Sequence, residues 1–298
     1  MNDRAPGDRP RKKSVKKAPK KPIVRNKRPG PPVRPGKRPP LRVMTTTLWE
    51  YPSQHYDSES GSGLVGSTMQ GDKDYTGATP SWVIWQLLQR YTRKGDRVLD
   101  PMCGSGTTID VANDLGRIGI GFDLAPSRED IEHADARELP QADGSVDFVF
   151  VDPPYSTHID YSDDPRCIGK LDASEVVRSG QKRGPDEPPA LMGEAYYEAM
   201  EEVIAECHRV LKNRRYFGLY VSDSFKKTKG KKGGTFMPIG FELFGIMRDY
   251  FKPVDMISVV RHNAKLQRGN WHKAAEEQNF FLRGFNYLFI MKKEDDSI

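Results

Sequence analysis

The 298-residue chain contains only three cysteines, Cys103, Cys167 and Cys207, which lie far apart. They form no CxxC pair and no Cys/His cluster, which argues against a zinc site and against a disulfide framework. No apolar run reaches the roughly 18 residues needed to span a bilayer, and no apolar stretch follows the charged N-terminus as in a secretory signal. The sequence therefore predicts a cytoplasmic protein without a membrane or metal partner, and it leaves the oligomeric state open.

Charge is distributed unevenly along the chain. Residues 1–42 contain sixteen Lys/Arg, two Asp and ten of the 23 prolines, a net charge of +14, so the formal +6 of the whole chain leaves −8 on the rest. A segment of this composition cannot bury enough apolar surface to fold. We predict a disordered basic arm over residues 1–42 that tethers nucleic acid, with a solubilising tail or a targeting remnant as the alternative, followed by one domain over residues 43–298.

Strand-like and helix-like patterns alternate over residues 43–298, which predicts an α/β sheet with helices on its faces. Strands are expected at residues 97–101, 118–122, 146–151, 216–221, 254–260 and 285–291, with a weaker one at 134–136. Helices are expected to begin at residues 79–80 and after the turn at 103–106, and to cover residues 194–211 and 241–250.

A glycine-rich turn, DPMCGSGTT at residues 100–108, joins the first of these strands to its helix. Glycine allows the backbone to turn tightly and to approach a ligand closely, and the carboxyl ends of parallel strands form the usual ligand crevice. The GxGxxG and GxxxxGK[ST] spacings are absent, which argues against a nicotinamide site and against nucleotide hydrolysis. Taken alone, the segment could also be a plain tight turn.

Two further acids follow strand-like runs. Asp123 ends the next strand, where a carboxylate can accept hydrogen bonds from both hydroxyls of a ribose. Asp135, in the sequence ADAR, is placed to accept a hydrogen bond from an adenine amino group. Either acid alone could cap a loop, but three acids around one glycine turn, with Asp100, indicate a nucleoside-containing cofactor.

The tetrapeptide DPPY at residues 152–155 follows the apolar run VDFVFV. Its prolines stiffen the turn, so the Asp152 carboxylate and the Pro153 carbonyl can together accept both hydrogens of a planar amino group. Tyr155 offers a ring face on which a base can stack. A base amine is inaccessible within a duplex, so a duplex substrate would have to flip its target base out. In isolation DPPY could be a rigid surface turn.

In this order the motifs resemble those of the class I S-adenosylmethionine-dependent methyltransferases, specifically the amino-methyltransferases of DNA, over about residues 45–295. The resemblance implies a Rossmann-like fold with a mostly parallel seven-stranded sheet and helices on both faces. It implies S-adenosylmethionine as cofactor, with the glycine turn at the methionine part, the two later acids at the ribose and the adenine, and TGATP at residues 76–80 at the carboxylate. The expected cofactor-binding residues are Thr79, Asp100, Pro101, Cys103, Gly104, Ser105, Gly106, Thr107, Asp123, Asp135 and Ala136.

The resemblance also implies the reaction, with Asp152, Pro153, Pro154 and Tyr155 as catalytic residues. DPPY is most similar to the adenine-N6 enzymes, so methyl transfer to N6 of adenine in DNA is expected. Cytosine-N4 enzymes usually carry Ser at the first position, and guanine-N2 enzymes of RNA use similar tetrapeptides. The alternatives are therefore DNA cytosine-N4 methylation, RNA base methylation at guanine N2 or adenine N6, and a catalytically silent nucleic-acid-binding module.

Restriction-type relatives have a sizeable recognition region, whereas the candidate segments in this chain are small. They are a polar loop at residues 156–192, a stretch with five lysines at residues 222–238, and residues 261–284, which we expect to be the main substrate loop between the last two strands. The lysine stretch could instead be a solvated loop, and the histidines could be surface residues. The expected nucleic-acid contacts are His158, Lys226, Arg261, His262, Lys265, Arg268 and Trp271.

Overall fold

The computed structural model describes residues 38–58, 70–72, 75, 77–157, 159, 161–174, 193–227, 234–262, 266 and 268–295. These residues belong to one compact unit that begins at Arg38. The predicted arm up to residue 37 lies outside the described residues, as do two of the expected nucleic-acid contacts, His158 and Lys265. Within the described segments, no helix is both long and apolar enough to cross a bilayer.

The main sheet has eight strands in the order β1-β9-β10-β6-β5-β2-β3-β4. All neighbours are parallel except β10, which runs antiparallel to β9 and β6. The strands are β1 Leu48–Trp49, β2 Arg97–Asp100, β3 Ile118–Asp123, β4 Glu132–His133, β5 Val146–Val151, β6 Leu211–Val221, β9 Lys252–Val260 and β10 Phe285–Lys292. The predicted mostly parallel α/β sheet is confirmed. Seven strands were expected, and the eighth, β1, is too short to show an alternating pattern.

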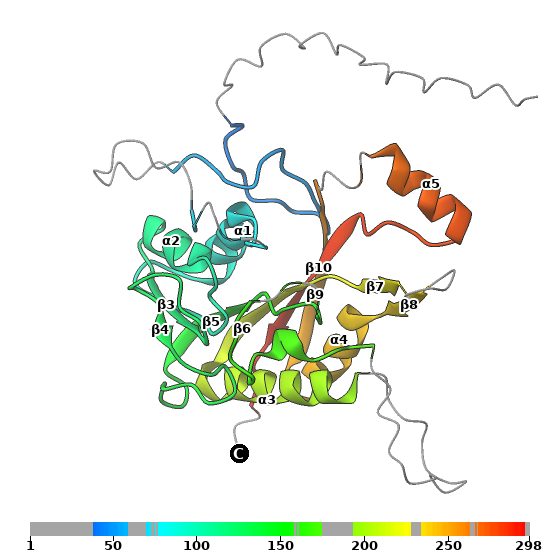
Figure 1. Cartoon of the computed structure of the whole chain (residues 1–298). Helices are drawn as coiled ribbons and strands as arrows, with labels where there is room; N and C mark the ends of the chain where they lie inside the picture. The colour runs from blue at the N-terminus through cyan, green and yellow to red at the C-terminus, as the bar shows by residue number, and fades with distance from the viewer. Residues whose placement is uncertain are drawn as a thin grey trace, which may run out of the picture. The chain divides into compact units, whose positions relative to one another are not determined.

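Two pairs of helices cover the sheet, one pair on each face (Figure 1). The helices α1 Ser81–Tyr91 and α2 Thr107–Asp114 pack on one face, and α3 Glu194–Val210 and α4 Ile239–Tyr250 pack on the other. The periodic apolar residues of α1 and α3 that predicted these helices are buried, except Tyr91 at the end of α1, which is half-buried, as expected for the inward stripe of an amphipathic helix. The second core cluster includes Ile84 and Leu87 of α1, and the first includes Met200 and Cys207 of α3.

The structure corrects three local expectations. The weak strand lies at Glu132–His133, directly before residues 134–136, because its two residues pair with Phe122 and Asp123 of β3. The expected loop at residues 261–284 contains a helix, α5 Gly269–Gln278, none of whose residues is buried. The lysine stretch at residues 222–238, for which a solvated loop was one alternative, contains the antiparallel strands β7 Ser224–Lys227 and β8 Gly234–Met237.

Candidate active site

The order of strands reverses between β2 and β5. From β2 the chain continues outward through β3 and β4, and it then returns to place β5 and β6 on the other side of β2. Such a switch point in an open parallel sheet opens a crevice at the carboxyl ends of the strands, where ligands bind. Asp100 ends β2 and Asp152 directly follows β5, so the two predicted acids flank this crevice.

The glycine turn has the left-handed backbone that its sequence predicts. Gly104 has φ +49° and Gly106 has φ +78°, a region that favours glycine. The amide of Gly106 donates to the Cys103 carbonyl (2.9 Å), and the Ser127 hydroxyl donates to the Gly104 carbonyl (2.6 Å). A β-carbon added to Gly104 would lie 2.7 Å from the hydroxyl oxygen of Tyr75. The turn therefore admits a close neighbour against its backbone.

Tyr75 is a residue of this site that the sequence did not reveal. Its ring lies against Gly104, and its pKa is raised far above the ordinary value by burial and by the nearby charges of Asp123, Asp152 and Asp100. The Tyr75 phenol is therefore within electrostatic reach of Asp100 in the glycine turn, Asp123 at the end of β3 and Asp152 in the tetrapeptide. Only its position next to the TGATP segment could have indicated it.

The acids at the ends of β2 and β3 are held by the turn itself. The buried Asp100 carboxylate accepts hydrogen bonds from the Thr108 hydroxyl (2.5 Å) and the Met102 amide (3.1 Å). The half-buried Asp123 carboxylate accepts from the amides of Gly104 (2.9 Å) and Ala125 (2.8 Å). Asp100 therefore holds the two ends of the turn through Met102 and Thr108, and Asp123 connects the turn to the end of β3.

Asp135 lies two residues beyond the end of β4. It forms an ion pair with Arg137, with a shortest distance of 2.7 Å, and hydrogen bonds with this arginine lower the pKa of the carboxyl group. Its side chain is 20% exposed, so the ionised carboxylate remains accessible. The neighbouring Ala136 is buried.

The other predicted cofactor residues fall into two groups. Pro101, Cys103, Ser105 and Thr107 are buried in or beside the glycine turn, where the Ser105 and Thr107 hydroxyls lie 2.8 Å apart. Thr79 differs, because its hydroxyl donates to Oδ2 of Asp152 at 2.5 Å. The structure thus places Thr79, which was expected at the cofactor, in contact with the tetrapeptide.

The tetrapeptide is fixed at each end by hydrogen bonds. At its start, Oδ1 of Asp152 accepts from the Tyr155 hydroxyl (2.8 Å), while Thr79 occupies the other oxygen. At its end, the Pro154 carbonyl accepts from the Tyr196 hydroxyl (2.8 Å) and the Ser156 amide (3.0 Å). The Tyr155 hydroxyl therefore positions the carboxylate, a role that its expected use as a stacking face did not include.

Ser156, which no motif of the sequence singled out, explains how the chain leaves the tetrapeptide. It is buried and has φ +63°, a left-handed backbone uncommon outside glycine. Its hydroxyl oxygen accepts from the Ala173 amide (2.9 Å) and lies 3.4 Å from the Asp172 carboxylate. Asp172 also pairs with Lys226 of β7, so that predicted nucleic-acid contact is engaged within the protein.

The remaining predicted nucleic-acid contacts are brought together only in part. Arg261, just after β9, donates to the Ser222 hydroxyl (3.2 Å), and its charge acts on Asp152. The exposed His262 lies 3.6 Å from Glu50, Arg268 precedes α5 and is exposed, and Trp271 on α5 is half-buried.

Among the described residues, no group of three or more His, Cys, Asp or Glu side chains could hold a metal ion.

A family model described as DNA methylase, of the N6/N4 methyltransferase type, matches residues 5–133 and 146–297. The chain belongs to the DNA methylase family. This family comprises enzymes that methylate amino nitrogens of nucleic-acid bases, and S-adenosylmethionine, the predicted cofactor, is its cofactor. The residues around the crevice fit that cofactor, because carboxylates end successive strands beside a turn that a β-carbon would crowd.

Individual relatives match shorter parts of the chain. The type II methyltransferase M.MthZI of Methanothermobacter thermautotrophicus is 30% identical over 95 residues, which cover 30% of this chain and 26% of that protein. The tRNA (guanine(10)-N2)-dimethyltransferase of the Delta H strain of this archaeon is 35% identical over 78 residues, 21% of this chain and 23% of that protein. A solved SAM-dependent methyltransferase of Methanosarcina mazei is 13% identical, covers 70% of this chain and 98% of that one, and has a TM-score of 0.40.

The ionisation of Asp152 predicts a pH dependence of the methyl-transfer rate. Burial raises the pKa of this carboxyl to about 7, while hydrogen bonds from Thr79 and Tyr155 oppose the increase. Only the ionised carboxylate carries the negative charge that would stabilise positive charge developing on an amino nitrogen, so the single-turnover rate should rise about tenfold between pH 6 and pH 8. Burial also raises the pKa of Asp100 to about 7. The pH dependence of the rate should therefore persist in the Asp100→Asn variant at saturating cofactor. If the pH dependence disappeared in that variant, it would belong to the ionisation of Asp100.

Proposed function

We propose that this chain transfers a methyl group to the exocyclic N6 amino group of adenine in DNA. The observation that supports the proposal is the Asp152 carboxylate, fixed by Thr79 and Tyr155 at the carboxyl end of β5, beside the crevice of the glycine turn. When bound, S-adenosylmethionine would supply an electrophilic methyl group, whose bond to the sulfonium sulfur breaks to leave the neutral thioether S-adenosylhomocysteine. Asp123 and Asp135 would hold its ribose and adenine, and the turn around Gly104 its methionine part.

The tetrapeptide acts on the target amine in this proposal. The Pro154 carbonyl already accepts two hydrogen bonds, from Tyr196 and Ser156, whereas each Asp152 oxygen accepts one and can accept a second. The Pro153 carbonyl and Asp152 would therefore accept the two amino hydrogens. These hydrogen bonds orient the nitrogen lone pair toward the methyl group. As the N–C bond forms, positive charge develops on the nitrogen, and the carboxylate stabilises it. The nitrogen must lose one proton, which Asp152 can hold because its pKa is about 7.

A second candidate is methylation of guanine N2 in RNA, which is favoured by the match to a tRNA guanine-N2 dimethyltransferase. Both candidates use an exocyclic amine on a base that is not stacked in a duplex. The deciding experiment incubates the full chain and labelled cofactor with genomic DNA and, separately, with total RNA, and then identifies the modified nucleosides by mass spectrometry. We expect N6-methyladenine in DNA. Labelled guanosine in RNA alone would replace the first candidate by the second.

We also propose that the basic N-terminal segment increases encounter with nucleic acid. Two residues of the predicted arm hydrogen-bond to later segments: the Pro39 carbonyl accepts from the Tyr51 hydroxyl (2.7 Å) and the Arg42 carbonyl accepts from the Gln86 side chain (2.7 Å). A deletion that spares these hydrogen bonds removes residues 1–37, which hold fourteen Lys/Arg and two Asp, and changes the formal net charge from +6 to −6.

Deletion of residues 1–37 should weaken binding to long DNA and flatten its salt dependence. For each phosphate that the segment neutralises, the deletion should reduce the slope of log affinity against log salt by roughly 0.9. Cofactor affinity should stay unchanged, because the cofactor residues begin at Thr79. The measurement is DNA binding at several salt concentrations by both forms. Equal affinities and slopes would favour a solubilising or targeting segment over a tether.

A further inference from the structure

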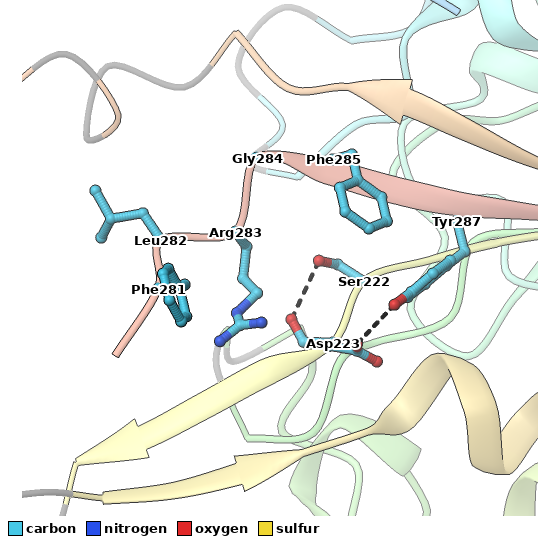
Figure 2. Close-up of a pocket in the computed structure, with 8 residues that line it drawn as sticks. All are labelled: Ser222, Asp223, Phe281, Leu282, Arg283, Gly284, Phe285 and Tyr287. Carbon is cyan, nitrogen blue, oxygen red and sulfur yellow. Dashed lines mark hydrogen bonds between the residues drawn. The ribbon is translucent and has the colours of Figure 1, made fainter. Parts of the chain in front are cut away.

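A pocket lies where the chain leaves β6 and where it enters β10 (Figure 2). One wall is formed by Ser222 and Asp223, which directly follow β6, and the other by residues 281–285, with Phe281, Arg283 and Phe285. None of the tetrapeptide residues lines it. The pocket is therefore separate from the place of the target amine, and its function is not explained by the reaction described above.

The Asp223 carboxylate forms a fixed acceptor in this pocket. The residue is only 7% exposed, and its two oxygens accept hydrogen bonds from the Gly240 amide and the Tyr287 hydroxyl, each at 3.0 Å. Gly240 lies in the first turn of α4, where free backbone amides favour a negative charge. Each carboxylate oxygen can accept a second hydrogen bond. A ligand can therefore donate to Asp223 without displacing its internal partners.

Arg283 supplies donors opposite this acceptor. Its guanidinium carbon lies 5.0 Å from the centre of the Phe236 ring, and its Nε is buried without a hydrogen-bond partner among the described residues. Figure 2 shows the guanidinium directed into the pocket, between Phe281 and Asp223. A buried donor without an acceptor costs free energy, and the rest of the guanidinium, on a half-buried side chain, has further N–H donors for a ligand in the pocket.

Two phenylalanines at the pocket expose unusually large apolar surfaces. Phe281 is 81% exposed and Phe285 is 41% exposed, although Phe280 beside them is stacked on Phe225 with 5.1 Å between ring centres. Exposed aromatic rings beside an arginine are typical of surfaces on which unstacked bases bind, because every base offers a π face. The combination suits a flat ligand whose edge carries both donors and acceptors.

The position of the pocket relates this ligand to the substrate. Ser222 lines the pocket and accepts a hydrogen bond from Arg261, whose charge also acts on the catalytic candidate Asp152. Arg261 thus interacts with both the pocket and the Asp152 carboxylate. We propose that it holds a second, unpaired base of the nucleic-acid substrate, a neighbour of the methylated base, stacked on Phe281 and Phe285 with its edge between Asp223 and Arg283. This inference rests on the proposed function, because it takes a nucleic-acid strand as the substrate.

The first test measures binding of a fluorescein-labelled, random-sequence single-stranded DNA 20-mer to the full chain. Phe281→Ala and Arg283→Ala should each weaken binding about tenfold, the loss expected for one base–aromatic stack. The matched controls are Ile118→Ala, an exposed apolar residue at the start of β3, and Arg248→Ala, an exposed arginine in the last turn of α4. Both should bind as the unchanged chain does. Wild-type affinity in the two pocket variants would overturn the inference.

The second test uses an oligonucleotide that the enzyme methylates, with an abasic site on one or the other side of the target. One abasic position should raise KM about tenfold with little change in kcat. Arg283→Ala should raise KM similarly on the intact strand but add nothing on that abasic strand, because both changes remove the same interaction. Independent, multiplicative effects would exclude the pocket while methylation itself stands. If no nucleic acid is methylated, the proposed function fails, and the binding test still decides whether the pocket holds a base.

Discussion

Replacing Asp152 by alanine should reduce methyl transfer by at least about a hundredfold, as expected when a group that stabilises developing charge is removed. Cofactor affinity should stay within a few-fold of the unchanged chain, because the carboxylate faces Thr79 and Tyr155, whereas the Gly104 amide of the glycine turn donates to Asp123. The measurement pairs single-turnover methylation with a calorimetric cofactor titration. A loss confined to the chemical step would reflect an interaction made mainly in the transition state.

One further variant separates charge from shape at this position, and a variant at another residue serves as its control. Asp152→Asn keeps the size of the side chain and one acceptor oxygen, but it loses the charge and the second acceptor, so its rate should fall nearly as far as that of the alanine variant. Asp249→Ala removes an exposed acid near the end of α4, outside the candidate recognition segments, and should leave the rate unchanged. Near-normal single-turnover rates in Asp152→Ala would rule out the mechanism proposed for the tetrapeptide.

The parts of the fold that could be predicted from sequence are those in which burial imposes a periodic pattern. The run VDFVFV is buried throughout as β5, and the apolar stripe of α3, including Met200 and Val203, is inaccessible to solvent. The helix α5 could not be predicted in this way, because it buries none of its residues and Trp271 is its only large apolar side chain. The two-residue strand β1 is defined by pairing with β9, an interaction between segments distant in sequence.

The candidate site shows a similar division between local and long-range information. The motifs placed Asp100, Asp123 and Asp152 correctly at the ends of adjacent strands, because a strand followed by an acid is a local pattern. The interactions between motifs were not visible in the sequence. Thr79 bonds to Asp152, 73 positions away, and Tyr75 lies on the glycine turn. Such interactions depend on the order of the strands, which brings the segment before α1 to the crevice.

Replacing Asp123 by alanine should lower cofactor affinity at least about tenfold while the fold persists. Hydrogen bonds to charged groups contribute roughly 1.5–3 kcal/mol, and this carboxylate is the candidate acceptor for the ribose hydroxyls. The structure adds a second reason, because the carboxylate also fixes the amides of Gly104 (2.9 Å) and Ala125 (2.8 Å). Without it, the glycine turn keeps the hydrogen bond from the Cys103 amide to the Phe122 carbonyl but loses the one from Gly104. The variant should therefore lack an acceptor for the ribose and have a less ordered turn.

Calorimetric titration with S-adenosylmethionine measures this loss, and a thermal melt checks that the fold persists. Asp123→Asn retains one acceptor oxygen for the turn but not the charge, so its affinity should lie between those of the alanine variant and the unchanged chain. Glu129→Ala removes an exposed acid from the same connection between β3 and β4 and should bind the cofactor normally. Unchanged affinity in Asp123→Ala would remove this residue from the cofactor site. An equal loss in the alanine and asparagine variants would show that the charge, more than the order of the turn, determines the affinity.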